Sequence, residues 1–213
     1  MPASTSIPAT APDHPAVVAT RAWLDKAVIG LNLCPFAKSV HVTGRIRWRV
    51  SEATTPDELL ADLADELRLL ADTDAEQIDT TLLIHPRVLT DFLDYNDFLD
   101  VADAAVDALK LGDLLQVASF HPQYRFADTE PDDISNFTNR SPFPTLHLLR
   151  HASVDRAVAA FPDAADIFEA NIATLQRLGL SGWRRLMGEG GDGIGNGSGN
   201  GSDRRNDGPD SRG

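Results

Sequence analysis

Two histidines followed by proline are the first residues whose type and position point to chemistry. His85-Pro86 follows the apolar segment 80–84, and His121-Pro122 follows the apolar segment 114–120. Proline ends a strand and fixes the turn after it, and open α/β sheets bind ligands at the carboxyl ends of their strands. If the two strands are parallel neighbours, both imidazoles lie at one rim, where they can transfer protons or ligate a metal. The alternative is that each ring only caps its strand.

The single cysteine, Cys34, is a second candidate, and Pro35 follows it directly. A proline at this place can open a short helical turn with the thiol at its N-terminus, where the helix dipole favours the thiolate. Cys34 is therefore a predicted nucleophile. The alternative is a small buried hydrophobic residue, because its neighbours are mostly apolar.

A long loop at 122–144 is the third feature, and it is neither glycine-rich nor of low complexity. Loops of this length are uncommon in compact domains unless they serve a function. The guanidinium fork of Arg140 suits a carboxylate or a phosphate, and neutral side chains beside it add hydrogen bonds. The predicted substrate-binding residues are Arg140, Asn139, Ser141, Asn136 and His147. The alternative is a structural loop whose polar groups satisfy its own backbone.

Prolines and aromatic residues fix this loop, so we expect it to fold back over the rim from which it departs. Arg140 and His121 would then share one pocket for a small anionic molecule. The predicted catalytic residues are His121, His85 and Cys34. These residues single out no cofactor, no metal and no oligomeric state.

The hydrophobic pattern alternates between helical and strand periods and so predicts the elements that position these residues. Helices are expected at 17–31, after the cap Thr55, from the cap Thr90 to Leu109, at 153–160 and at 164–178, where Gly179 ends the last one. Strands are expected at 46–50, 80–84 and 114–120. Arginines alternate with apolar residues along 46–50, which predicts an edge strand with one wet face. The segment 114–120 is nearly all apolar, which predicts a central strand covered on both faces.

The order αβαβαβαα predicts an α/β fold with a small, largely parallel three-stranded (or slightly larger) sheet and flanking helices. A ferredoxin-like antiparallel sheet is the alternative, but a hairpin signal is missing. The expected organisation is a disordered lead-in at 1–15, one domain at 16–187, and a disordered tail at 188–213 that is rich in Gly, Asn, Ser and Asp.

Charge and composition restrict the class of protein. The chain has 213 residues and a formal net charge of −13, which argues against binding to nucleic acid or to acidic lipid. It has one cysteine, its first residues do not resemble a secretion signal, and no apolar run approaches the roughly 18–20 residues that span a membrane. The expected location is the cytoplasm.

Several long segments resemble the uncharacterised bacterial and plant family known as domain of unknown function 1415. The resembling segments are 28–38 (VIGLNLCPFAK), 80–86, 91–100 (DFLDYNDFLD), 116–126 (QVASFHPQYRF) and 136–150 (NFTNRSPFPTLHLLR). The resemblance covers most of residues 17–180 and implies a single-domain protein. It implies no particular activity.

The leading hypothesis from the sequence is a cytosolic enzyme with a His/Arg site, and with Cys34 or a metal as a further participant, that acts on a small anionic substrate. Its rivals are a non-catalytic module that binds a metal, haem or a small anion, and a protein-interaction domain.

Overall fold

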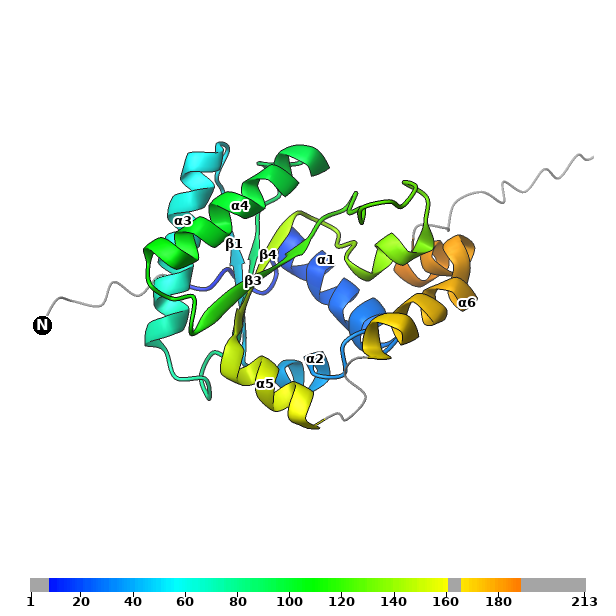
Figure 1. The fold of residues 1–213 in the computed structure, drawn as a ribbon, viewed down its shortest axis with the longest axis horizontal. Helices are drawn as coiled ribbons and strands as arrows, with labels where there is room; N and C mark the ends of the chain where they lie inside the picture. Colours follow the sequence, from blue (N-terminus) through cyan, green and yellow to red (C-terminus); the bar gives the residue numbers. More distant parts are fainter. Residues whose placement is uncertain (1–7, 161–165, 189–213) are drawn as a thin grey trace, which may run out of the picture.

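A computed structural model of the chain describes residues 8–160 and 166–188. Its centre is a four-stranded sheet in the order β1-β2-β4-β3 (Figure 1). The strands are β1 (Ile46–Val50), β2 (Thr80–Ile84), β3 (Leu115–Phe120) and β4 (Thr145–Arg150). β1 and β2 are parallel, whereas β4 runs antiparallel to both β2 and β3. Residues 189–213 of the expected tail and residues 1–7 of the expected lead-in lie outside the described residues.

The predicted α/β fold with flanking helices is confirmed, and the sheet is slightly larger than three strands, but the prediction that it is largely parallel is wrong, because the sequence analysis did not identify β4. The strand has only six residues, directly after the long loop, and it inserts between β2 and β3. β3 therefore lies at an edge of the sheet and not at its centre. Because β4 is antiparallel to both neighbours, β1, β2 and β3 still point the same way. We call the end to which they point the carboxyl end of the sheet, and the opposite end the amino end.

Helices α3 (Pro56–Asp72) and α4 (Phe92–Ala108) cover one face of the sheet (Figure 1). The predicted capping box is confirmed, since Thr55 and Glu58 cap each other's backbone at the start of α3. α4 is capped by Asp91 and not by Thr90, because the Asp91 carboxylate accepts hydrogen bonds from two backbone N–H groups of the first turn. A stripe of fully buried leucines along α3 fills this half of the core, namely Leu59, Leu63, Leu67 and Leu70.

The other face is covered by α1 (Pro15–Trp23), which continues into a π-helical turn η1 (Leu24–Ile29), and by α6 (Ile167–Met187). Buried Trp23, Trp48 and Trp183 belong to this half of the core. The shorter elements are α2 (Ala37–Val42), η2 (Ile134–Thr138) and α5 (His151–Ala160). In the described part of the chain, no helix is both long and apolar enough to cross a membrane.

Gly179 breaks α6, as its sequence position predicts, but the chain stays helical beyond it. Its φ of 65° and ψ of 169° lie in a region that is nearly restricted to glycine. The break redirects the segment 180–187, which packs against the long loop.

β1 lies at an edge of the sheet, which confirms that part of its prediction, but its arginine face is not wet. Arg47 is buried and donates to both carboxylate oxygens of Glu66 on α3, at 2.6 and 2.8 Å. α3 covers this face, and Glu66 supplies the counter-charge that a buried guanidinium needs. Upstream of α1, Thr10 pairs with the outer side of β1 through its backbone and its hydroxyl.

Candidate functional site

His85 and His121 both lie at the carboxyl end of the sheet, just after β2 and β3, with the start of β4 between the two strands. Both residues are fully buried. Both rings pack against Tyr95 of α4, with ring centroids 5.7 and 5.0 Å from the tyrosine ring. The structure therefore brings the two predicted histidines to one rim, but it places their rings in the core beneath α4.

The hydrogen bonds of these rings hold the turns that follow the strands. Nδ1 of His85 lies 3.0 Å from the Val88 carbonyl, which can only accept, so this nitrogen carries the proton. His121 accepts from the Gln123 backbone N–H at Nδ1, and its Nε2 donates to the Leu89 carbonyl at 3.3 Å. Burial lowers the pKa of His85 to about 4 and also lowers the pKa of His121. Both imidazoles are therefore neutral at pH 7.

The long loop is pinned by its own polar side chains. Asn136 is fully buried, and it accepts from the Phe126 N–H and donates to the Glu130 carbonyl. The Asn139 amide donates to the Ser119 carbonyl, and the Asn139 backbone carbonyl accepts from the backbone N–H of His121. The loop thus returns to the strand end from which it departs. The buried Ser141 hydroxyl donates to the Phe143 carbonyl, so these three predicted ligand-binding residues bond to the protein itself.

Arg140 is fixed in the loop on one side and faces open space on the other. Its Nε donates to the Tyr124 carbonyl at 3.2 Å, and its Nη2 donates to the Pro131 carbonyl at 2.6 Å. The guanidinium stacks on Phe137, 4.2 Å from the ring centroid. Partial burial lowers its pKa, and the nearby Asp132 carboxylate opposes that shift.

The guanidinium faces a cleft with a volume of about 490 Å³, which we call the main cleft. Its walls are α1 with η1, the long loop, and the segment 180–187 of α6. The charged lining residues are Lys26, Asp132, Arg140 and Arg184, and the apolar ones are Ala19, Ala22, Trp23, Pro122, Phe137, Pro142, Leu180, Trp183 and Met187. Ser141 also lines it. The volume falls in the range of about 300–1,000 Å³ that is typical of small-molecule sites.

A second cleft of about 370 Å³, the side cleft, opens beside the start of α4. Asp91, Phe92 and Arg125 contribute to its lining. Arg140 and Asp132 line both clefts, so the two clefts meet at this pair of opposite charges.

His147 and Cys34 line neither cleft. His147 lies on β4, where its ring donates from Nε2 to the Thr80 hydroxyl at 2.7 Å, since that hydroxyl donates to the Leu148 carbonyl. Burial lowers the pKa of His147 to about 4. Cys34 precedes α2 and packs against the core formed by α1 and α6. Across residues 8–160 and 166–188, no three His, Cys, Asp or Glu side chains converge as metal ligands would.

Sequence reasoning did not find Lys26 and Arg184 of the main cleft. Each is a cation on the same helical segment as a tryptophan of the cleft wall, Trp23 and Trp183 respectively. Residues three apart share a helical face, so the spacing of Trp23 and Lys26 was the sequence pattern that could have indicated this wall of the cleft. The position of Arg184 depends on the break at Gly179, which the helical period does not convey.

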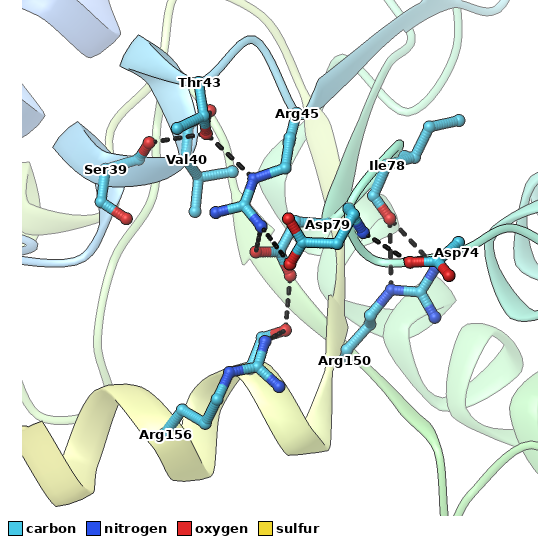
Figure 2. Close-up of polar contacts among 11 residues, drawn as sticks. Ser39, Val40, Thr43, Arg45, Asp74, Ile78, Asp79, Arg150 and Arg156 are labelled. Atoms are coloured by element: carbon cyan, nitrogen blue, oxygen red, sulfur yellow. Dashed lines mark hydrogen bonds and ion pairs between the residues drawn. The ribbon is translucent and has the colours of Figure 1, made fainter.

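The amino end of the sheet holds a polar cluster of a different kind (Figure 2). Buried Asp79 accepts from Ser153 of α5 and forms an ion pair with Arg45 at 3.9 Å. Arg156 donates to the same Ser153 hydroxyl at 3.0 Å. Arg150 donates to the carbonyls of Leu70 and Thr73 at 2.6 Å each, and to that of Ile78 at 3.0 Å. Here the cations meet acceptors supplied by the protein.

These features describe an α/β protein with a mixed four-stranded sheet and an open cleft whose walls combine cations with aromatic side chains. The chain belongs to the DUF1415 family, described as proteins of unknown function, and residues 16–185 match the family. The resemblance seen in the sequence is thereby confirmed. No curated protein and no solved structure matches the chain.

Proposed function

We propose that the protein binds a small organic anion with an apolar or aromatic part in the main cleft. The observation that carries this proposal is the lining of that cleft, which combines Lys26, Arg140 and Arg184 with Trp23 and Trp183. The formal net charge of the chain is −13, so three cations at one cleft stand against its overall charge. Such a local reversal of charge attracts anions to this place.

All three cations have hydrogen-bond donors that no described residue uses. Lys26 and Arg184 are exposed, and neither makes an ion pair or side-chain hydrogen bond within the described part of the chain. Arg140 uses Nε and Nη2 on backbone carbonyls, and no acceptor among the described residues contacts its Nη1. A ligand carboxylate or phosphate can complete these donors with charge-assisted hydrogen bonds.

Binding without catalysis is the form of the proposal that the lining supports. His85 and His121 are fully buried beneath α4, and Cys34 lies elsewhere, so none of the predicted catalytic residues lines the main cleft. The described lining residues include no histidine and no cysteine, the side chains that most readily act as base or nucleophile near neutral pH. The proposal therefore assigns the cleft to recognition of the ligand.

A pair of matched probes tests this function. Indole-3-propionate carries the indole ring and a carboxylate, and its amide carries the same ring without the charge. Calorimetry at pH 7.5 should show saturable binding of the acid and at least about tenfold weaker binding of the amide, since each charge-assisted bond contributes about 1.5–3 kcal/mol. Equal affinity for the two probes, or no binding of the acid, would contradict the proposal.

Substitutions locate the binding. Lys26→Gln and Arg184→Gln should each weaken the acid about three- to tenfold and leave unfolding nearly unchanged, because both side chains are exposed. Lys38→Gln is the matched control, since Lys38 is an exposed lysine that does not line the cleft. An equal loss of affinity in the control would show that only the overall charge matters.

A further inference from the structure

Of the described residues that line the main cleft, Asp132 is the one with an acidic side chain. Three cations line the same cleft. Its side chain is exposed, and it makes no hydrogen bond and no ion pair within residues 8–160 and 166–188. Arg140, the cation of the same loop, donates to backbone carbonyls and not to Asp132. Asp132 instead faces both clefts, so it is available to a ligand.

The backbone fixes the spacing between Asp132 and Arg140. Nη2 of Arg140 donates to the carbonyl of Pro131, the residue before Asp132, at 2.6 Å. A second bond, from Nε to Tyr124, and the stacking on Phe137 keep the guanidinium in place. The guanidinium of Arg140 is thus held near Asp132, but it donates no hydrogen bond to the Asp132 carboxylate. The two opposite charges are close enough for Asp132 to favour the charged form of Arg140.

A held guanidinium with an opposite charge beside it matches a ligand that carries the complementary pair of charges. We propose that the ligand is a zwitterion of the α-amino-acid type, with its carboxylate on Arg140, its ammonium on Asp132 and an apolar or aromatic side chain against Trp23 and Trp183. This inference rests on the proposed function of the main cleft. It adds that an anion without an amino group leaves the Asp132 carboxylate unmatched beside the ligand.

The side chain of the ligand has a defined direction in this arrangement. The charged pair lies at the junction of the two clefts, whereas the apolar walls from α1 and from the segment 180–187 belong to the main cleft alone. A ligand held by both charges therefore projects its side chain between these helices.

Three probes with one ring system test this inference. L-tryptophan carries both charges, indole-3-propionate lacks the ammonium, and tryptamine lacks the carboxylate. With the full chain at pH 7.5, calorimetry should show L-tryptophan binding at least about tenfold more tightly than indole-3-propionate, and tryptamine binding most weakly. Asp132→Asn should weaken L-tryptophan about tenfold and change indole-3-propionate by less than about twofold, because only the ammonium contacts Asp132.

Asp128→Asn is the matched control. Asp128 is an exposed aspartate of the same loop that lines neither cleft, and its φ of 62° is one that asparagine tolerates. This variant should bind all three probes as the natural chain does. Circular dichroism of each variant would establish that it is folded.

The outcomes separate the two proposals. If indole-3-propionate binds as tightly as L-tryptophan and Asp132→Asn changes both equally, the zwitterion is wrong and the anion-binding cleft stands. If none of the probes binds, the proposed function and the zwitterion both fall. A tenfold preference for L-tryptophan that survives Asp132→Asn would also overturn the role of Asp132.

Discussion

The two ends of the sheet use arginine in different ways. At the amino end, Arg150 has three backbone carbonyls as acceptors, and Arg45 pairs with Glu76 and Asp79 (Figure 2). At the carboxyl end, Arg140 makes two bonds to its own loop, and the remaining part of the guanidinium faces the main cleft. The residue type is the same, but the supply of acceptors differs.

This difference distinguishes charged clusters that stabilise the fold from charged clusters that can bind a ligand. A cation whose donors are all matched by the protein holds segments together, and its loss leaves carbonyls without a partner. A cation with unmatched donors at a cleft contributes less to folding and has capacity left for a ligand. The amino end is therefore expected to determine stability, and the carboxyl end is expected to determine binding.

The largest effect is expected from the amino end. Arg150→Ala removes the donor shared by Leu70, Thr73 and Ile78, which ties the end of α3 to the sheet. We expect it to lower the free energy of unfolding by about 3 kcal/mol, since hydrogen bonds to a charged group contribute about 1.5–3 kcal/mol. Urea unfolding measures the change.

Arg87→Ala serves as the control at the carboxyl end. Its exposed ion pair with Glu52 spans 3.2 Å, and such pairs contribute at most about 1 kcal/mol. If the two variants lose the same stability, the contrast between the two ends does not hold.

A somewhat smaller effect is expected from acid at the carboxyl end. Burial lowers the pKa of His85 from 6.5 to about 4 in the folded protein, so the unfolded chain binds this proton more readily. The stability that His85 contributes is therefore complete above pH 6.5 and is lost as the pH falls toward 4. Linkage gives a loss of about 2 kcal/mol between pH 7.5 and pH 5.

Urea unfolding across that pH range, compared with His85→Asn, isolates this contribution. Asparagine can retain a donor for the Val88 carbonyl but does not titrate, so the variant should lose correspondingly less stability on acidification. His151→Asn, at the amino end, is the control. An unchanged pH slope in His85→Asn would mean that His85 is not the group that takes up the proton.

The smallest effect compares two glycines with positive φ, one near each end. Gly179 has a φ of 65° and redirects the wall of the main cleft, whereas Gly44, with a φ of 70°, precedes β1 at the amino end. Nothing lies within 4 Å of a Cβ placed at either position, so alanine adds strain without a clash. Each alanine variant should lose about 1–2 kcal/mol of stability.

Binding distinguishes the two glycine variants. Gly179→Ala should also weaken indole-3-propionate several-fold, because the segment 180–187 carries Trp183 and Arg184 into the cleft. Gly44→Ala should bind the probe as the natural chain does. Equal binding by both variants would show that the cleft does not depend on the break in α6.

The sequence by itself determined the local features of this protein. The capping box at Thr55 and Glu58, the leucine stripe of α3, and the strand before His85 all follow from the residues and their spacing. The break at Gly179 is equally local, because glycine is favoured at a positive φ. Membership of the DUF1415 family is also carried by short runs of residues, so the amino-acid sequence is enough to recognise it.

Only the tertiary structure decided which residues meet. β4 separates β2 from β3, and the place of a six-residue strand in a sheet depends on its partners and not on its own pattern. His85 and His121 share one rim, yet α4 closes over their rings, because burial depends on what packs above a strand end. Lys26, Asp132, Arg140 and Arg184 come from three separate parts of the chain. Their meeting in one cleft follows from helix packing and the returning loop, which are long-range contacts that no short stretch of sequence encodes.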